Sequence, residues 1–535
     1  MTNNIEVKCV IFDPKQDTYS VLLKYEHGFN RTSKIEIPLS DLTSKGLASI
    51  LSDKMGPEYE GDFSQLAKSL RDDAKASPEK VRASRFGLQD DGRTLVSTSR
   101  VFRKGAKIAS YIKPNCLAEH YGRRGNTNQW RTISEYMKLS SPLTFGICAA
   151  FAAPIMRLTD LRSRAFVFSG ETRGGKSTAI RAAASVAGHK PDAELPTFNF
   201  TEAGSTELFE SYNGILLPLD DLELQDGTAK VKHENVHRFA YLYSDGQSKK
   251  KSKYAIEAGN ASHATWRSLS LLGAENGPDV LAKKAGELRQ PGAAQRLILI
   301  PVGDHIFDFD DSDNVDVIKH CTAITKIIEL NFGCPLDNFL RKFSLNLKES
   351  KAAFAFYLSE VRKALLKERA IDKIRSVADY FALVGAAGMM ACDFGILDVD
   401  HKHIKRSIKR CFVRASKHID AERYEITRGI KRLQLFVEQA PRVSKGDNVR
   451  SDCKGFVRIN KGNSVLVISR QHFIGLYEGR LQARLVAKHL SLAGDIAAEA
   501  PEPLPVSLDW AEEQVNWPFK TGSKRVRSIC IAINN

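Results

Sequence analysis

The stretch RAFVFSGETRGGKSTAIRAAASVAG, residues 164–188, organises the rest of the chain. Ala165 to Phe168 form a short apolar run with aromatic and β-branched residues, which predicts one buried strand. The alanine-rich segment that begins near Lys176 favours a helix, and Gly188 stands where such a helix ends. The sequence therefore predicts a strand, a glycine-rich loop and a helix in immediate succession.

The glycine-rich loop fits the P-loop pattern G-x-x-x-x-G-K-[ST], in which glycines let backbone N–H groups surround a phosphate. The helix N-terminus adds partial positive charge. We expect Lys176 to contact the β- and γ-phosphates of ATP and the Ser177 hydroxyl to hold Mg²⁺. The predicted loop residues are Gly170, Glu171, Thr172, Arg173, Gly174, Gly175, Lys176, Ser177 and Thr178.

A second apolar run, Ile215 to Leu219, ends in the acidic pair Asp220 and Asp221. At this distance after a P-loop, the pattern predicts a Walker B strand that delivers carboxylates to its carboxyl end. We expect Asp220 to hold Mg²⁺ through water, and Asp221 to orient or deprotonate the attacking water. Pro218 cannot donate a ladder hydrogen bond, so a bulge or local irregularity is expected there.

Lysines crowd the segment that follows a predicted helix, Val231 to Tyr243. The sequence predicts a hairpin here, with a turn at Glu257 to Ala261 and a return arm that includes Arg267 to Leu272. A basic hairpin at this point can project into the pore of a ring and bind a phosphate backbone, and a solvated charge run is the alternative. The candidate nucleic-acid contacts are Lys249, Lys250, Lys251 and Lys253.

Other polar residues follow the hairpin. The strand after it can present a sensor of the γ-phosphate, and Ser270, Glu275 and Asn276 are open candidates. Arg296 precedes the last predicted core strand, LILIPV. It is either a partner in a surface ion pair or an arginine finger that reaches the γ-phosphate of a neighbouring subunit.

The composition fits a basic globular protein. The 535 residues include 79 Lys and Arg against 63 Asp and Glu, a net charge of +16, which favours a polyanionic partner such as nucleic acid. The nine cysteines form no C-x-x-C pair, which argues against a zinc ribbon or a disulfide framework and favours a reducing, cytoplasmic compartment. No signal peptide is expected. The longest apolar stretch, Leu143 to Met156, is too short to span a bilayer and predicts a buried helix.

We expect four regions along the chain. Residues 1–110 form a small accessory α+β domain, 111–310 a P-loop core, 311–445 a helical lid, and 446–535 a C-terminal module. Leu95 to Phe102 is predicted as one strand of the first region. The other strands and helices predicted there are Val7–Phe12, Tyr19–Lys24, Lys34–Pro38, Ser40–Leu51 and Phe63–Ala74.

The C-terminal module is predicted to be winged-helix-like. Residues 441–462 are polar and predict a linker. A strand (Val465–Ile468), two helices (Gln471–Tyr477 and Arg480–Leu492) and a basic tail strand (Lys524–Ile533) follow it. The second helix is either a recognition helix for DNA or an ordinary solvated face. Its basic side chains at i, i+4 and i+8 are Arg480, Arg484 and Lys488.

Several of these segments resemble the family called domain of unknown function 927, helicase-like ATPases of phages, plasmids and integrated mobile elements. The resemblance rests on the stretch from Trp130 through the P-loop, on LPLDDLE, on GAAQRLILIP, on FALVGAAGMMACDFGILD after Arg375, and on ISRQHF and VAKHLSLAG. It covers about residues 115–535. It implies a ring-forming AAA+ core similar to minichromosome maintenance helicases, with a hairpin before sensor 1, a helical lid and a winged-helix end.

The resemblance also implies roles for two arginines. Arg296 fits the position of an arginine finger, and Arg375 on the lid is a sensor-2-like residue that competes or cooperates with it. AAA+ enzymes usually carry Asp-Glu in Walker B, and Asp220-Asp221 departs from that pattern. Aspartate is one methylene shorter, so slow hydrolysis or a different water position is expected. Viral superfamily-3 helicases also use paired aspartates.

The sequence as a whole predicts an α/β P-loop protein that hydrolyses ATP with Mg²⁺. The expected function is that of a helicase or translocase on DNA. We expect a homo-oligomer, in the form of a hexameric ring, that acts in the bacterial cytoplasm without a membrane partner. One alternative is a protein-remodelling or signalling AAA+ ATPase that does not act on nucleic acid. The other is a nucleotide-gated DNA-binding module without turnover.

Overall fold

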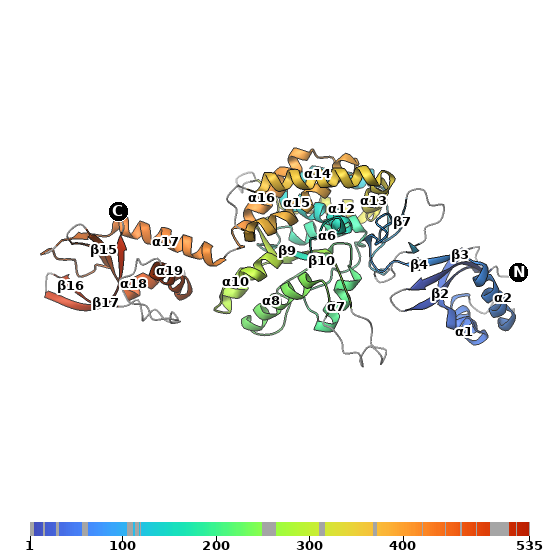
Figure 1. The fold of residues 1–535 in the computed structure, drawn as a ribbon, viewed down its shortest axis with the longest axis horizontal. Helices are drawn as coiled ribbons and strands as arrows, with labels where there is room; N and C mark the ends of the chain where they lie inside the picture. The colour runs from blue at the N-terminus through green and yellow to red at the C-terminus, as the bar shows by residue number, and fades with distance from the viewer. Residues whose placement is uncertain are drawn as a thin grey trace. The chain divides into compact units, whose positions relative to one another are not determined.

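A computed structural model gives the fold (Figure 1). The chain forms two compact units, and each is described by itself: Met1–Gly277 with Gln295–Ala415, and Pro278–Ala294 with Ser416–Asn535. The residues that the structure describes are 5–13, 17–27, 31–55, 62–103, 111–112, 117, 119–248, 264–309, 316–366, 372–419, 421–444, 446–460, 463–477, 479–492, 513–519 and 522–533.

A four-stranded parallel sheet forms the centre of the first unit, in the order β10-β11-β9-β12. Its strands are β9 (Arg164–Gly170), β10 (Leu217–Leu219), β11 (Leu269–Ala274) and β12 (Leu297–Gly303). Every residue of β11 is buried, as in parallel sheets that helices cover on both faces. The carboxyl ends of the four strands meet at one edge, where ligands bind in sheets of this kind.

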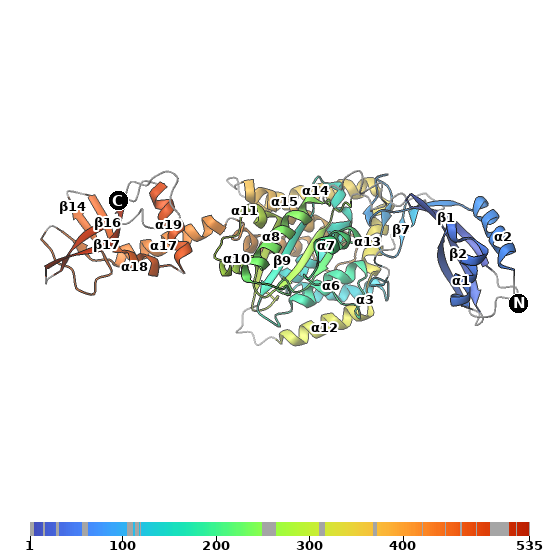
Figure 2. The same cartoon turned by 90° about the horizontal axis from the view of Figure 1, so that it is seen from below.

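Helices cover both faces of this sheet, as Figure 1 and Figure 2 show. On one side lie α14 (Leu347–Leu365) and α15 (Asp372–Asp393), and on the other α7 (Glu202–Ser211) and α8 (Ala229–Asp245). The remaining helices of the first unit are α3 (Thr127–Trp130), η3 (Arg131–Ile133), α4 (Ser134–Met137), α5 (Ser141–Ala152), η4 (Ala153–Leu158), α6 (Lys176–Ala187), α12 (Val317–Leu330), α13 (Cys334–Leu345) and α16 (His401–Ser416).

The apolar stretch around α5 is a core helix, as predicted. All twelve residues of α5 are buried. Its Phe145 ring lies 4.8 Å from Phe166 of β9 and 5.1 Å from Phe381 of α15, measured between centroids. Among the described residues, Ser141–Leu158 is long and apolar enough to cross a membrane, but 89% of it is buried inside the protein. Aromatic packing of this kind explains why a helix without a polar face is stable here.

Pro218 sits in a regular strand rather than at a bulge. Leu217, Pro218 and Leu219 pair with Ser270, Leu271 and Leu272 of β11 without a shift of register. β10 is the edge strand of the four, and proline is tolerated at an edge because the ladder needs no N–H from it there. The expected irregularity is therefore not found in the pairing with β11.

The segment Leu95–Phe102 was expected to be one strand and is two. β6 (Leu95–Val96) and β7 (Val101–Phe102) form a small antiparallel sheet with β5 (Gly87–Leu88), and the chain turns between them. The hydroxyls of Ser97 and Ser99 in this turn donate to the buried Asp337 carboxylate of α13 at 2.6 and 2.8 Å. These two bonds favour a turn where the residue pattern suggested a continuous strand.

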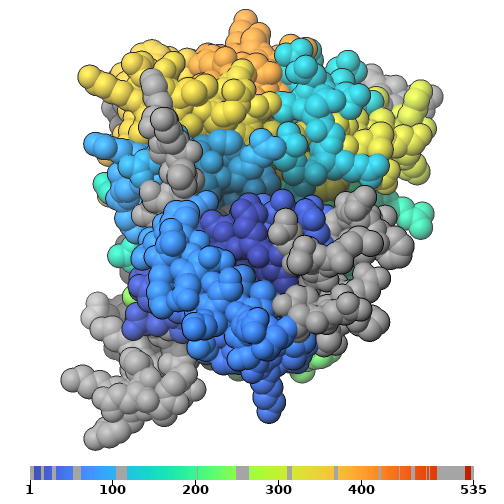
Figure 3. Space-filling view, turned by 90° about the vertical axis from the view of Figure 1, so that its right-hand side faces the viewer, coloured from blue at the N-terminus to red at the C-terminus, as the bar shows by residue number. Residues whose placement is uncertain are grey.

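The N-terminal region contains the predicted strands and helices, and its strands form a second sheet. β1 (Ile5–Asp13), β2 (Thr18–His27) and β3 (Arg31–Pro38) are antiparallel neighbours, and the full order is β3-β2-β1-β4-β8. Its core consists of aliphatic residues from these strands and helices, and Figure 3 shows its surface in blue. The remaining elements are η1 (Leu39–Asp41), α1 (Ser44–Met55), α2 (Phe63–Ala76), β4 (Glu79–Arg82) and β8 (Tyr111–Ile112).

The second unit is built on a five-stranded sheet in the order β13-β14-β15-β17-β16. Residues 441–462, expected to be a linker, contain its strands β13 and β14, so that prediction was wrong. Phe456 and Val457 of β14 are fully buried, and they hold this polar segment in the sheet. The elements are α10 (Pro278–Lys284), α17 (Ala421–Gln439), β13 (Arg442–Val443), β14 (Gly455–Asn460), β15 (Asn463–Ser469), α18 (Arg470–Gly475), α19 (Arg480–Leu492), β16 (Glu513–Phe519) and β17 (Gly522–Ile533).

Candidate functional site

The loop between β9 and α6 has the close backbone approach that the P-loop pattern predicts. Gly175 adopts φ 87° immediately before α6, a conformation that favours glycine. A Cβ at Gly170 would overlap the carbonyl oxygen of Gly303, the last residue of β12, and a Cβ at Gly174 would overlap the carbonyl oxygen of Asp304, the next residue. Glycine is therefore required at these positions, and Gly188 ends α6 at φ 103° as expected.

Lys176 lies inside this loop. Its Nζ donates hydrogen bonds to the carbonyl oxygens of Gly170 at 2.9 Å and Glu171 at 2.6 Å, and the residue is only 9% exposed. Burial lowers the pKa of Lys176, while the carboxylates of Glu275 and Glu223 act in the opposite direction. The ammonium group is thus held at the carboxyl edge of the sheet by carbonyl acceptors of its own loop.

Ser177 and Asp220 meet at the same edge. The Ser177 hydroxyl donates to Asp220 Oδ1 at 3.1 Å, although the two residues are 43 positions apart in the chain. The backbone of Asp220 is fixed beyond β10, since its N–H donates to the Pro196 carbonyl at 2.9 Å and its carbonyl accepts from Phe198 N at 3.2 Å. A hydroxyl and a carboxylate are the oxygen ligands that Mg²⁺ uses beside waters and phosphates.

The donor set fits Mg²⁺ rather than a metal held by protein side chains alone. Among the described residues, no group of three or more His, Cys, Asp or Glu side chains is placed to hold a metal ion. Ser177 and Asp220 supply two oxygens, which matches an ion that keeps several waters and binds substrate phosphates. The pair predicted from sequence is therefore together in space.

Asp221 lies one residue beyond this pair in an unusual conformation. Its φ of 53° is rare for a residue with a Cβ, and its exposed carboxylate accepts a hydrogen bond from Glu223 N at 3.2 Å. Strained residues of this kind persist only where the surroundings hold them. The carboxylate that we expected to act on water is thus exposed and belongs to a residue with strained backbone geometry.

Glu223 was not singled out from the sequence, and it lies at the same edge. Its Oε1 accepts a short hydrogen bond from Asn276 N after β11. Its Oε2 is buried and has no hydrogen-bond partner among the described residues. Burial raises the pKa of this carboxyl, and backbone N–H groups only partly oppose that shift. The one available signal was its position three residues after Asp220 in LPLDDLE.

The three candidate sensors of the γ-phosphate differ in where the structure places them. Ser270 is fully buried within β11 and donates to the Leu217 carbonyl at 3.0 Å, so it cannot reach a ligand at the edge. Glu275 and Asn276 follow the end of β11, next to the P-loop. The Thr172 hydroxyl donates to Glu275 Oε1 at 2.8 Å. Glu275 and Asn276 are therefore the two candidates that the geometry retains.

A cavity of about 440 Å³ opens beside the P-loop. The helix α12 forms its other wall, and a Cβ on Gly175 would lie 2.8 Å from Cys321 Sγ of that helix. The volume falls in the range of pockets that enclose a small organic ligand, about 300–1,000 Å³. Its lining residues are Arg173, Gly174, Gly175, Lys176, Ser177, Thr178, Ile318, Cys321, Thr322, Thr325, Lys326 and Glu329.

Arg296 lies at the opposite edge of the sheet from the P-loop. The next residue, Leu297, pairs with Ala165 near the start of β9, whereas the P-loop follows the end of that strand. β9 has seven residues, which corresponds to about 20 Å at ~3.3 Å per residue. The Arg296 guanidinium lies 4.4 Å from the ring centroid of Tyr241 in α8. This arginine therefore cannot reach a phosphate that is bound by its own chain.

Arg375 lies in the same region as Arg296. The Ser376 hydroxyl, one residue after Arg375, donates to Gln295 Oε1 at 3.2 Å, and Gln295 directly precedes Arg296. Arg375 also approaches Asp372 in its own helix at 3.9 Å, a weak exposed pair. The two arginines that were predicted to act on phosphate are thus neighbours, away from the P-loop of their own chain.

Comparison with known proteins finds one family model that matches the N-terminal part of the chain. Residues 1–262 match the model of the family described as Domain of unknown function (DUF927). The chain is therefore similar to that family over these residues. The match includes the N-terminal 110 residues, where the resemblance seen in the sequence was weak, so the DUF927 region begins earlier than expected.

A solved structure supports the fold of the whole chain. It is described as SCCmec type IV Cch, an active helicase, and it is 16% identical, with a TM-score of 0.60 over 99% of this chain and 93% of that chain. This likeness shows a shared fold, a mixed α/β architecture with a parallel sheet. No curated protein matches the sequence.

The first arm and the turn of the predicted basic hairpin fall outside the described residues, and so do its four lysines, Lys249, Lys250, Lys251 and Lys253. The predicted return arm, Arg267 to Leu272, is described, and from Leu269 onward it belongs to β11, which pairs in parallel with β9 and β10. The described residues on either side are paired, because Gln247 bridges Thr265 in antiparallel fashion and Ser248 N donates to the Ala264 carbonyl at 2.9 Å. The residues that flank the basic segment on its two sides therefore lie next to each other.

The basic side chains of α19 share one exposed face. Arg480, Arg484 and Lys488 are all exposed, as their spacing predicts. α19 is also connected to α10, since Glu425 of α17 accepts from Lys283 at 2.6 Å and from Gln482 Nε2 of α19 at 2.8 Å. The opposite face of α19 is buried and consists of Gln482, Ala483, Val486, Ala487 and Leu490.

Proposed function

We propose that the chain is a Mg²⁺-dependent ATPase that translocates along or unwinds DNA in the replication of a mobile genetic element. The observation that supports this most is the convergence of Lys176, Ser177 and Asp220 at the carboxyl edge of the central sheet, with Ser177 and Asp220 3.1 Å apart. The shared fold with an active helicase of a mobile element supports the choice of nucleic acid as the partner.

Residues at this edge can stabilise the transfer of a terminal phosphoryl group. The P-loop N–H groups and the α6 N-terminus bind phosphate oxygens, and Lys176 adds a positive charge at the β- and γ-phosphates. Mg²⁺ held by Ser177 and Asp220 would neutralise charge on those phosphates. We assign Asp221 the role of orienting or deprotonating the attacking water, because its exposed carboxylate directly follows Asp220.

We further propose that the active form is a homo-oligomeric ring, a hexamer as in the resembled ATPases. Arg296 lies about 20 Å from its own P-loop, by the length of β9 at ~3.3 Å per residue, and the Ser376–Gln295 hydrogen bond places Arg375 in the same region. A neighbouring subunit whose P-loop edge docks against this region would receive both arginines. A guanidinium is permanently charged and binds two phosphate oxygens at once, which suits the charge that develops in the transition state.

ATP hydrolysis measured with and without single-stranded DNA tests the proposal. We expect turnover that requires Mg²⁺ and is stimulated by DNA. Lys176→Ala should lower hydrolysis by about 10²–10³-fold, the usual effect of removing one group that stabilises charge in the transition state. Lys230→Ala, which removes an exposed lysine of α8, is the matched control and should keep the parental rate.

Other outcomes identify the alternatives. Turnover that DNA does not change would indicate a protein-remodelling or signalling ATPase. DNA binding that responds to nucleotide without turnover would indicate a gated binding module. Hydrolysis by Lys176→Ala at the parental rate, with an unchanged circular dichroism spectrum, would contradict the assignment of the active site.

A further inference from the structure

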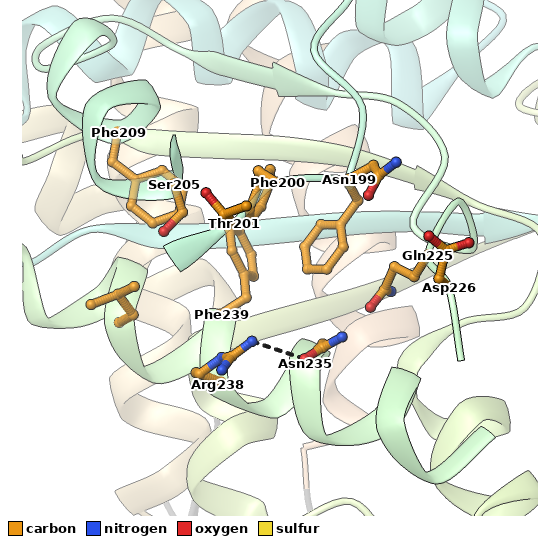
Figure 4. A pocket seen from close by; sticks show the side chains of 12 residues that line it. Asn199, Phe200, Thr201, Ser205, Phe209, Gln225, Asp226, Asn235, Arg238 and Phe239 are labelled. Atoms are coloured by element: carbon orange, nitrogen blue, oxygen red, sulfur yellow. Dashed lines mark hydrogen bonds between the residues drawn. The ribbon is translucent and has the colours of Figure 1, made fainter. Parts of the chain in front are cut away.

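A second cavity lies on the α7 and α8 side of the sheet, away from the P-loop residues (Figure 4). Its volume is about 180 Å³, below the roughly 300–1,000 Å³ of pockets that enclose drug-sized ligands. A single heterocycle matches this size better than a folded peptide segment does. The lining residues are Phe198, Asn199, Phe200, Thr201, Ser205, Phe209, Gln225, Asp226, Asn235, Arg238, Phe239 and Leu242.

Phenylalanine rings form the apolar part of this cavity. Phe198 lies 5.0 Å from Phe200 and 4.9 Å from Phe239 between ring centroids, and Phe209 lies 5.7 Å from Phe239. The Phe200 ring is only partly buried, so part of its surface remains available to a ligand. Aromatic faces of this kind stack on any nucleobase.

Polar groups occupy the rest of the lining, and they differ between its two ends (Figure 4). Gln225 donates through Nε2 to the Leu222 carbonyl at 2.6 Å, while its buried Oε1 has no partner among the described residues. The Asp226 carboxylate lies at the same end. A buried acceptor without a donor is costly, so this end suits a ligand that carries an N–H or amino group.

Arg238 lies at another part of the lining, beside Asn235. Its guanidinium donates to Asn235 Oδ1 at 2.9 Å, and the side chain is exposed. The helix α8 that carries both residues runs on to Asp245, shortly before the antiparallel pair Gln247 and Thr265 that brackets the lysine-rich segment.

We infer that this cavity binds one unstacked nucleobase of single-stranded nucleic acid, with the base against Phe200 and an adjacent phosphate on Arg238. Acceptors at Gln225 and Asp226 select bases with an exocyclic amino group over thymine. The inference rests on the proposed function, because it assumes that the chain binds a nucleic acid strand. A net charge of +16 favours this ligand over an aromatic peptide.

Fluorescence of 2-aminopurine, an amino-bearing base, tests the inference when one such base replaces a thymine of an oligo-dT strand. Stacking on a phenylalanine should change its emission when the full chain binds. Phe200→Leu keeps an apolar side chain but removes the ring, and affinity should fall about fivefold or more, since base–aromatic stacking contributes about 1–3 kcal/mol. Phe356→Leu, at an exposed phenylalanine of α14, is the matched control.

Arg238→Ala tests the phosphate contact separately. Loss of one contact to a single strand should reduce the salt slope of binding by about 0.7. Arg341→Ala is the matched control, because Arg341 donates to Asn338 at 3.3 Å in the same i, i+3 arrangement on α13. The control should leave the slope unchanged.

The outcomes distinguish failure of the cavity from failure of the proposed function. If wild type binds oligo-dT but Phe200→Leu and Arg238→Ala match it in affinity, emission and salt slope, the cavity does not bind a base. If wild type binds no strand, both proposals fail together. If a phenylalanine-containing peptide binds and Phe200→Leu abolishes that binding while strands bind normally, the cavity is a peptide site and the inference is wrong.

Discussion

The P-loop after β9 and the helix α19 both carry predicted ligand-binding residues, but they hold them differently. In the P-loop, Gly170 and Gly174 pack against backbone oxygens, and Lys176 is almost fully buried. On α19, Arg484 and Lys488 project from a face that contacts no core. When one of several buried groups that act together is removed, most of their combined effect on the ligand is lost. Exposed charges instead each add a small, independent contribution to binding.

The largest effect expected away from the P-loop concerns Arg296. In the proposed ring, this arginine would complete the nucleotide site of a neighbouring subunit. Arg296→Ala should lower hydrolysis by about 10³-fold or more, the effect of removing an arginine finger. Mixed with Lys176→Ala subunits, it should regain activity, because about one interface in four of a random ring then pairs an intact loop with an intact arginine.

Two measurements check this result. Arg375→Ala mixed with Lys176→Ala in the same way shows whether Arg375 cooperates with Arg296 or replaces it. Native mass spectrometry must show that the mixed rings form. Mixed rings without any recovered hydrolysis would leave Arg296 without a role at the neighbouring subunit, and its contact with Tyr241 would then be structural.

The next effect concerns the basic segment between α8 and β11. Replacement of Lys249, Lys250, Lys251 and Lys253 with alanine should keep basal hydrolysis and abolish most of its stimulation by DNA. The salt slope for single strands should flatten by about 2.8, or 0.7 for each lost phosphate contact. An unchanged slope would show that these lysines form a solvated charge run.

A smaller effect is expected on α19. Replacement of Arg480, Arg484 and Lys488 with alanine should weaken duplex binding and reduce its salt slope by about 2.7, or 0.9 for each contact. Removal of three exposed lysines elsewhere, Lys348, Lys363 and Lys402, gives a control with the same net charge. Equal duplex binding by both variants would make the α19 face an ordinary surface.

Point substitutions test α19 better than a truncation does. A truncation near residue 455 would remove α19 together with β15, β16, β17 and most of β14. Val443 of β13 pairs with Arg458 of β14, so that cut removes one partner of the pair. Loss of binding after it would combine unfolding of the second unit with loss of the charges. The three substitutions on α19 avoid this because their side chains are exposed.

The smallest effect concerns Glu223, a buried group with one unpaired oxygen. Because its pKa is raised in the folded state, the neutral acid is favoured, and the wild type loses stability as pH rises through that pKa. Glu223→Gln should therefore gain stability relative to wild type as pH rises above the ordinary pKa of glutamate, about 4.3. Denaturant unfolding at several pH values measures this, with the exposed Glu207→Gln as the control. A pH-independent difference would contradict it.

The sequence predicted the parts of the site whose geometry is local. The pattern around Lys176 specifies a strand, a loop and a helix that touch each other in the chain, and Asp220 follows from one apolar run. Arg296 was located correctly before β12, but its distance from its own P-loop depends on β12 running parallel to β9. That direction comes from long-range pairing, which periodicity does not encode.

Other features of the structure were not predicted from the sequence because tertiary contacts determine them. The turn at Ser97 depends on the Asp337 carboxylate, 240 residues away. Phe456 and Val457 form a buried strand within a polar segment that resembles a linker. Glu223 carries no motif of its own, and its burial depends on the position of Asn276 after a different strand. Such residues become recognisable only when the strands are placed side by side.

The backbone of Asp220 has a further consequence. Its N–H donates a hydrogen bond to the Pro196 carbonyl, and its carbonyl accepts one from Phe198 N. Phe198 also lines the second cavity. A ligand that shifts Phe198 would act on the backbone of Asp220 through the hydrogen bond from Phe198 N to the Asp220 carbonyl. Thermodynamic linkage then requires reciprocity: if a base in the cavity changes the affinity for Mg²⁺-nucleotide by some factor, the nucleotide changes the affinity for that base by the same factor.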